Sequence, residues 1–399
     1  MEVEAELLRV TDEKREKTIS NLRRFIQTPS VAPPGDEGKL APIIAETMEN
    51  IGMRVHVKEV YPDRPNVIGI LGDKEKPTLL LDGHMDVVPP GSGWTLDPFS
   101  GEIRNDKIYG RGASDMKGGL ASMLAAAEAL VEADVKLNGR FVLAAVSDEE
   151  VLAGGTWKMV SEGFRAEMAI IGEPTNLGIC TAHKGTLGVY ISTKGKSAHG
   201  SRPQEGINAI VKMSKIICEL ETFGAGLNQR KHPQLGNPTL SINLIKGGAK
   251  ENIVPDSCEI YLDIRTIPGE TEESWISEIE TFLKELEKRD PQLETSVTRQ
   301  KYPFKCLPLQ TPAEEEVVQI MKYAVRRALR REPFLTAFDG FTDGSLLSNY
   351  AQTPTVVFGP GKISQAHTAD EYVEIEQVIS AAKVYALAAF KALSGKNKS

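Results

Sequence analysis

The chain has 399 residues, 41% of them hydrophobic and 26% charged, which is the composition of an ordinary globular protein with room for two or three domains. Its formal net charge of −8 and the lack of a basic stripe argue against nucleic acid as a partner. The charged, amphipathic N-terminus lacks the apolar core of a signal peptide, and the apolar runs are too short to cross a bilayer. Four widely spaced cysteines favour free thiols over a zinc knuckle or a disulfide scaffold, so we expect a cytoplasmic protein.

Up to residue 183, helical and strand patterns alternate along the chain. Helices are predicted at 13–27, 39–51, 116–133 and 154–162. Strands are predicted at 55–60, 66–71, 78–81, 141–146 and 168–171. The runs 78–81 and 141–146 are almost wholly apolar, which is typical of central strands covered on both faces. This alternation predicts an α/β layer with ligands at the carboxyl ends of the strands.

After His183 the pattern changes. Strands at 186–193, 239–246, 258–265 and 293–298 and helices at 207–223 and 272–288 follow a βαββαβ order. This order fits a two-layer sandwich with an antiparallel sheet. The α/β pattern returns from Thr311, with helices at 312–330 and 375–393 and a strand at 354–358. We therefore expect a discontinuous catalytic domain, 1–183 and 301–399, with a smaller domain inserted at 184–300, and a frayed tail at 395–399.

Side chains suited to binding metal stand just past the apolar runs or in loops. They are His84, Asp115, Glu150, Glu173 and His367. Two histidines and three carboxylates can hold two divalent ions if one carboxylate bridges both, and Asp115 is the candidate for that bridge. Zinc suits this mixture of ligands, and manganese or cobalt can substitute.

Each of these signals is weak when it stands alone. A histidine at a strand end is more often a core or surface residue, and a Glu-Glu pair is usually a solvated helix start. The glycines around Arg111 lack the Lys-Ser/Thr of a phosphate-binding loop. The joint placement at element ends of one α/β layer is what favours a metal site.

Two further carboxylates belong to the same stretch. Asp86 follows His84 by two positions, so it should point to the same side and accept the second N–H of the imidazole. Glu149 precedes Glu150 and is the leading candidate for a general base, near the metal but not coordinated to it.

The segments GHMDVVPP, GRGASDMKGG, SDEE, GEPT and AHT together resemble the dinuclear metallohydrolase family of acetylornithine deacetylase, succinyl-diaminopimelate desuccinylase, aminoacylase and carboxypeptidase G. The resemblance runs from about residue 15 to 390. It implies that His84, Asp115 and Glu173 hold one zinc ion and that Asp115, Glu150 and His367 hold the other. It also implies that Glu149 is the base, that Asp86 supports His84, and that the inserted domain is a lid that forms a homodimer.

Residues of the inserted domain match further positions of that family. His199 resembles a histidine that stabilises the oxyanion in the neighbouring active site. The ordinary alternative for His199 is a loop residue without a catalytic role. Asn252 and Arg265 match positions that bind the carboxylate of the substrate, and an arginine fork suits that task. The ordinary alternative for Arg265 is an ion pair with Asp263 or with another neighbouring acid.

Two loops near the C-terminus, 342–344 and 359–361, resemble loops that line the family's substrate cleft, which makes Gly359 a candidate substrate contact. Phe341 stands where several members of that family have small glycines, so the resemblance does not determine the size of the substrate pocket.

The resemblance implies a metal-dependent amidohydrolase that deacylates N-acyl amino acids, of the acetylornithine deacetylase or succinyl-diaminopimelate desuccinylase type, by water activated at the metal pair. A carboxypeptidase or dipeptidase with the same chemistry is the nearest alternative. A non-catalytic binding protein on the same fold is a remote one, because such a protein has no need of an intact set of ligands and base.

Overall fold

The computed structural model describes residues 2–394, so the tail expected to fray lies outside the described residues. The chain divides into two compact units. The first comprises Gln310–Phe338 with the described residues of Met1–Ala182 and Thr342–Ser399, and the second comprises His183–Leu309 and Asp339–Phe341. The sequence places the limits of the inserted domain at 184 and 300, and it does not anticipate that 339–341 belongs to the second unit.

Within residues 2–394, the first unit is built on a nine-stranded mixed sheet of order β1-β2-β6-β3-β7-β15-β8-β13, with β14 paired to β8. Its strands are β1 (Arg54–Tyr61), β2 (Arg64–Leu71), β3 (Thr78–His84), β6 (Arg140–Val146), β7 (Met168–Ile171), β8 (Ile179–His183), β13 (Leu309–Gln310), β14 (Leu335–Phe338) and β15 (Thr355–Val357). The neighbours β6, β3, β7 and β15 run parallel to one another. Their carboxyl ends therefore meet at one edge of the sheet. A small sheet consists of β4 (Glu102–Arg104), β5 (Lys107–Tyr109) and β16 (Tyr372–Glu374).

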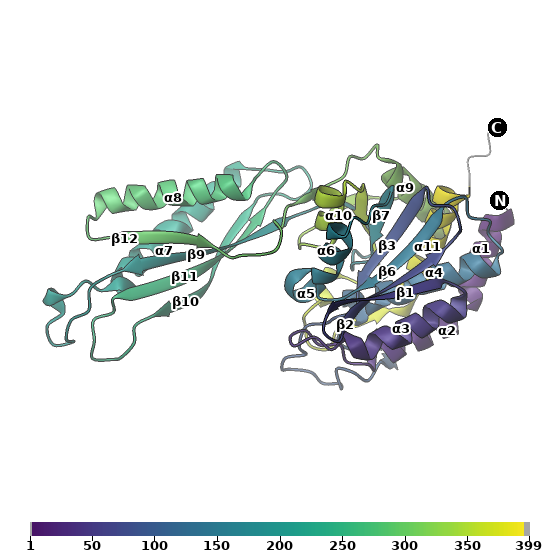
Figure 1. The fold of residues 1–399 in the computed structure, drawn as a ribbon, viewed down its shortest axis with the longest axis horizontal. Helices are drawn as coiled ribbons and strands as arrows, with labels where there is room; N and C mark the ends of the chain where they lie inside the picture. Colours follow the sequence, from purple (N-terminus) through teal and green to yellow (C-terminus); the bar gives the residue numbers. More distant parts are fainter. Residues whose placement is uncertain (1, 395–399) are drawn as a thin grey trace. The chain divides into compact units, whose positions relative to one another are not determined.

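Helices cover the sheet (Figure 1). They are α1 (Glu2–Glu13), α2 (Arg15–Ile26), α3 (Glu37–Ile51), α4 (Gly118–Glu132), α5 (Glu149–Leu152), α6 (Gly154–Ser161), α9 (Glu316–Leu329), α10 (Gly344–Ala351) and α11 (Ile375–Leu393). Helices α4 and α11 pack together against β3 and β6, whereas α6 and α10 pack against each other. Every residue of β3 is buried, as its apolar pattern predicts, so the strand that ends on His84 is held on both faces.

Two differences from the predicted helices have local causes. Helix α4 begins at Gly118 and not at residue 116, because Asp115 and Met116 have non-helical backbone angles in the turn 113–117. Helix α1, which the sequence marks only as an amphipathic stretch, buries Leu7 and Val10 in the main core. Among the helices of residues 2–394, none is long and apolar enough to cross a membrane.

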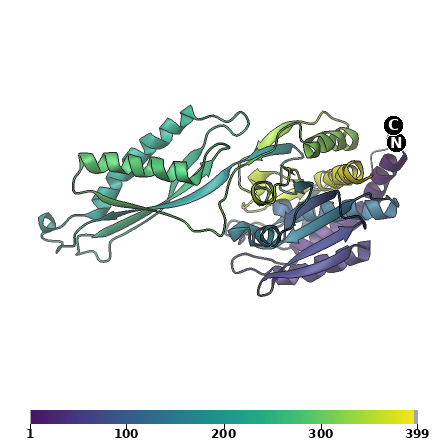
Figure 2. The ribbon, with the colours of Figure 1, turned by 45° about the horizontal axis from the view of Figure 1, so that its top comes forward.

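The second unit has its own core. In the described residues it contains a four-stranded antiparallel sheet of order β10-β11-β9-β12. Its elements are β9 (Gly185–Lys194), α7 (Ala209–Gly226), β10 (Thr239–Gly247), β11 (Ser257–Thr266), α8 (Glu272–Arg289) and β12 (Glu294–Arg299). Both helices lie on one face of this sheet (Figure 2). The predicted fold class, an α/β domain with a mixed sheet between helices plus an inserted two-layer α+β sandwich, is confirmed.

Candidate metal centre and active site

The parallel strands of the first unit deliver the candidate ligands to one edge. His84 is the last residue of β3, and Glu149 and Glu150 begin α5 just beyond β6. Glu173 follows β7, and Gly359 follows β15. Because β3 pairs in register with both β6 and β7, side chains far apart in the sequence become neighbours.

Asp115 lies between the two histidines and faces one with each carboxylate oxygen. Its Oδ1 is 3.2 Å from Nε2 of His84, and its Oδ2 is 3.3 Å from Nε2 of His367. Glu173 Oε1 lies 3.3 Å from the His84 nitrogen, and Glu150 Oε2 lies 3.1 Å from the His367 nitrogen. The structure thus brings all five predicted ligands together as two half-sites that share Asp115.

The electrostatics of this cluster favour positive charge at both histidines. Hydrogen bonds that the His367 ring donates to the carboxylates of Asp115 and Glu150 raise the pKa of His367 to about 10. Burial by itself lowers the pKa of His84, but contacts with Asp115 and Glu173 outweigh it and hold that pKa well above the ordinary value. Burial and the charge of Asp115 raise the pKa of Glu173 to about 7. Buried carboxylates in such proximity need cations, so the donor set fits a pair of divalent metal ions.

The backbone fixes the ring of His84. Its Nδ1 lies 2.9 Å from the main-chain carbonyl oxygen of Asp86, which can only accept, so Nδ1 carries a proton and Nε2 faces the cluster. This differs from the predicted contact, because the Asp86 carboxylate itself is 3.8 Å from that nitrogen. The strand ends at His84, so the alternation of side chains expected to carry through to Asp86 no longer holds there.

The Asp86 carboxylate binds the main chain at the start of α5. It is fully buried and accepts the main-chain N–H groups of Glu149, at 3.1 Å, and Glu150, at 3.0 Å. It therefore caps the first turn of α5 and fixes the position of the candidate base and of a candidate ligand. Burial, reinforced by the charge of Glu173 and opposed by that of His84, raises the pKa of Glu149 well above its ordinary value. A raised pKa suits a group that must take up and release a proton.

Gly359 contacts the strand end that carries Glu173. A Cβ at position 359 would lie 2.1 Å from the carbonyl oxygen of Gly172 and 2.6 Å from that of Glu173, so only glycine fits. This geometry makes Gly359 a close-packing position beside a candidate ligand, and its contact with substrate stays a prediction.

The expected place of the neighbouring loop 342–344 in the lining of the substrate cleft stays a prediction. The side chain of Asp343 is buried, and the single hydroxyl of Thr156 lies 2.9 Å from its Oδ2 and 3.2 Å from Oδ2 of buried Asp82. Asp343 therefore faces the interior. Burial raises the pKa of Asp82 to about 7.

Sequence reasoning missed the ion pair behind the turn that carries Glu149. Arg64 donates to both carboxylate oxygens of buried Glu37, at 2.6 and 2.8 Å, and lies 2.7 Å from Asp148. Glu37 also accepts the main-chain N–H of Asp148 at 3.1 Å. The partners lie far apart in the sequence and share no local pattern, so sequence carries no signal for this network.

The remaining candidates lie in the second unit. His199 is exposed, and its Nδ1 accepts the N–H of Ser201 at 3.2 Å, so the proton of the neutral ring sits on Nε2 and is free to donate. Asn252 is also exposed. It lies beside His199, since the main-chain N–H of Gly200 donates to the Asn252 carbonyl oxygen at 2.8 Å. Arg265 is half-buried and pairs with Asp263 at 2.9 Å, which is the ordinary alternative foreseen for it.

Comparison with known proteins identifies the class of enzyme. Residues 80–391 match peptidase family M20/M25/M40, and the chain belongs to this family. The expectation of a metal-dependent hydrolase that acts on amide bonds is thereby confirmed.

Three similar proteins illustrate the range of the family. The chain is 28% identical to N-formyl-4-amino-5-aminomethyl-2-methylpyrimidine deformylase of Bacillus subtilis (strain 168), with 95% of each chain covered. It superposes on aminopeptidase PepT of Bacillus cereus with a TM-score of 0.75 and 22% identity, covering 94% of this chain and 97% of PepT. It also superposes on the Bacillus subtilis YxeP protein, described as a dinuclear metal-binding peptidase, with a TM-score of 0.72 and 18% identity, covering 96% and 99%. At these identities the two structures show a shared fold.

Proposed function

We propose that this protein is a two-metal amidohydrolase that removes an acyl group from the nitrogen of an N-acyl amino acid, as acetylornithine deacetylases and succinyl-diaminopimelate desuccinylases do. The observation that carries the proposal is the position of Asp115, with one oxygen toward each histidine. Two half-sites that share one carboxylate are the arrangement expected of a paired-metal hydrolase. The name of the Bacillus subtilis relative supports a deacylase, since formyl is the smallest acyl group.

In this proposal His84, Asp115 and Glu173 would hold one cation, and Asp115, Glu150 and His367 would hold the other. The bound pair would polarise the amide carbonyl and lower the pKa of water; zinc is the first choice, with cobalt or manganese as substitutes. Asp86 keeps Glu149 in place through its main-chain N–H. Glu149 takes the proton of the attacking water and delivers it to the departing amine.

The second unit would supply the groups that recognise the substrate. His199, in its own or a neighbouring subunit, would donate from Nε2 to the developing oxyanion. Asn252 and Arg265 would bind the carboxylate of the substrate. The pairing of Arg265 with Asp263 means that a substrate carboxylate must compete with an existing partner.

The test is a hydrolysis panel measured with added zinc, cobalt or manganese. It should contain N-formyl, N-acetyl and N-succinyl amino acids, an N-formyl aminomethylpyrimidine, and dipeptides. We expect cleavage of N-acyl amino acids with kcat/KM at least tenfold above that for dipeptides. Preference for dipeptides would establish the peptidase alternative, preference for the pyrimidine would establish a deformylase, and no hydrolysis with any metal would favour the binding protein.

We also propose that the second unit forms a homodimer. Strand β10 is an edge of its sheet and exposes Leu244 and Ile245 at 62% and 60%, and Ile210 and Val211 at the start of α7 are exposed as well. An exposed apolar edge strand favours pairing with another chain. Light scattering should give the mass of a dimer for the wild type and of a monomer for Leu244→Lys; a monomeric wild type would contradict the proposal.

A further inference from the structure

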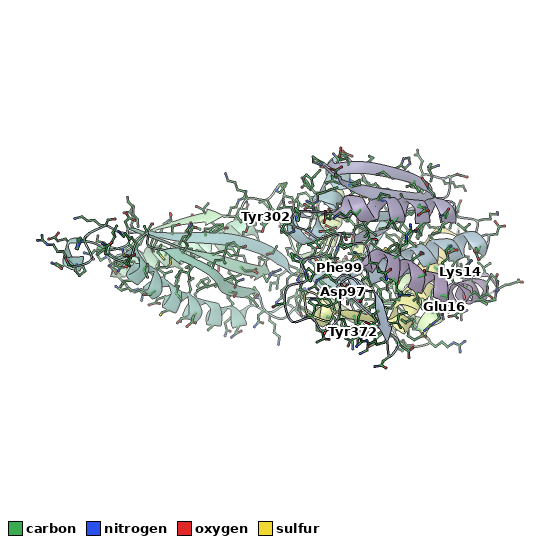
Figure 3. The ribbon with its side chains drawn as sticks, turned by 90° about the horizontal axis from the view of Figure 1, so that it is seen from below. Lys14, Glu16, Asp97, Phe99, Tyr302 and Tyr372 are labelled. Atoms are coloured by element: carbon green, nitrogen blue, oxygen red, sulfur yellow. The ribbon has the colours of Figure 1, made fainter. Side chains whose placement is uncertain are left out.

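The turn that carries Asp115 is held by a buried carboxylate outside the candidate ligand set. Glu371 is fully buried, in the same short segment as His367, and begins the approach to β16. Tyr372, the next residue, is labelled in Figure 3 on the same side of the first unit as Asp97 and Phe99. The Glu371 main chain also joins the turn, because the Gly110 N–H donates to its carbonyl oxygen at 2.8 Å.

Among residues 2–394, the groups that donate hydrogen bonds to the Glu371 carboxylate all belong to the segment 111–115. One oxygen accepts the main-chain N–H groups of Ser114, at 2.8 Å, and Asp115, at 3.0 Å. The other accepts the main-chain N–H of Gly112, at 3.1 Å, and Nη1 of Arg111, at 2.6 Å. The guanidinium of Arg111 is equally buried, so the charge of the carboxylate is matched by a full cation.

These contacts decide where the Asp115 side chain can point. In the turn 113–117, Asp115 and Met116 depart from helical angles, so the regular hydrogen bonds of a helix do not fix this stretch. The N–H of Asp115 itself is bound to Glu371, so a shift of that carboxylate moves the Cα that carries the shared ligand. The segment that contains Glu371 also carries His367, whose Nε2 lies 3.3 Å from Oδ2 of Asp115.

We propose that Glu371 is a positioning residue for the metal pair: it holds the turn 111–115 so that Asp115 presents one oxygen to each half-site. Glu371 binds no metal itself. The proposal rests on the proposed function, because it presumes that Asp115 is the shared ligand. Carboxylates that orient a metal ligand from behind commonly contribute 10–100-fold to metal affinity or activity.

Glu371→Gln is the sharpest variant. Its amide oxygen can still accept from Ser114 and Asp115, but its NH2 group faces the donors of Gly112 and Arg111. The side chain at position 371 therefore keeps its shape but loses half of its hydrogen bonds. Glu371→Asp keeps the charge, but its shorter side chain cannot reach the donors of both carboxylate oxygens at once. It serves as the second variant if Glu371→Gln does not fold.

A matched control lies next to it in the chain. Asp370 is also a carboxylate that accepts main-chain N–H groups, but those belong to Thr95, at 2.9 Å, and Leu96, at 3.3 Å. Asp370→Asn therefore perturbs the same segment without touching the Asp115 turn.

The experiment measures zinc and cobalt affinity by competition with a chromophoric chelator, on full-length variants shown to be folded by near-ultraviolet circular dichroism. For Glu371→Gln or Glu371→Asp we expect metal affinity to fall at least tenfold, kcat to fall with KM within threefold of wild type, and activity to recover partly in excess metal. For Asp370→Asn we expect metal affinity within twofold of wild type.

A Glu371 variant with lower melting temperature but unchanged metal affinity would overturn the proposal, since it would leave Glu371 with a purely structural role. An equal loss of affinity in Asp370→Asn would also overturn it, by assigning the effect to the whole segment. If wild type binds no metal at all, the proposed function fails first, and that outcome is distinct from either of these.

Discussion

Replacing Glu149 by glutamine should remove nearly all turnover while the protein still binds its metals. The substitution preserves shape, and the main-chain N–H of Glu149 keeps its 3.1 Å bond to Asp86, so the turn stays in place. What is lost is proton transfer, which contributes roughly 10²–10⁴ in rate, or about 3–5 kcal/mol of transition-state stabilisation. We therefore expect kcat to fall by about 10²–10⁴ with little change in KM.

Glu150→Gln is the control that separates a base from a ligand. Both variants remove one negative charge from the same turn, so the effect of charge on cation binding is common to them. Glu150, unlike Glu149, places both oxygens 3.1–3.2 Å from His367. Glu150→Gln should therefore bind metal more weakly than Glu149→Gln, and its activity should recover in excess metal.

Steady-state kinetics at saturating zinc or cobalt, with metal content measured on the same samples, decide the matter. Glu149→Gln should keep the same low kcat at every metal concentration. If it retained more than a tenth of wild-type kcat, or recovered when metal was added, its assignment as the base would be refuted.

Three further predictions concern the second unit. His199→Gln should lower kcat by roughly 10²–10³ if the ring donates to an oxyanion, with an unchanged melting temperature; an unchanged kcat would assign His199 to the surface. Arg265→Ala should raise KM at least tenfold for substrates with a free carboxylate, and an equal effect on amides without one would contradict a carboxylate contact. Burial lowers the pKa of His183 to about 4, against about 6.5 when unfolded, so protons bind preferentially to the unfolded chain below pH 6.5. Stability should fall as the pH drops from about 6.5 toward 4, by roughly 2 kcal/mol at pH 5, and denaturant titrations of His183→Asn should lack this loss.

The sequence predicts the sheet edge well because its signals are local. The apolar run 78–81 ends almost at His84, and the run 141–146 ends just before Glu149, so strand and ligand are read from one short segment. The helix at 375–393 is observed with the same bounds, because its apolar spacing is regular and it is buried along its length. The carboxyl ends of parallel strands then bring such segments together.

The ion pairs that support the candidate site cannot be predicted from local sequence patterns. Glu37 and Arg64, and likewise Arg111 and Glu371, meet only because the chain has folded, and each residue by itself reads as an ordinary surface charge. The orientation of the Asp86 carboxylate depends on where β3 stops, which hydrophobic alternation does not determine. Short strands such as β8 and β14 depend on pairing with neighbours and not on their own composition.

The most direct test is anomalous diffraction from crystals of the enzyme grown with zinc or cobalt, recorded at the absorption edge of the metal. Two peaks per chain are expected, on either side of Asp115, with His84 and Glu173 beside one and His367 and Glu150 beside the other. A single peak, or peaks away from these five side chains, would contradict a paired-metal centre held by Asp115.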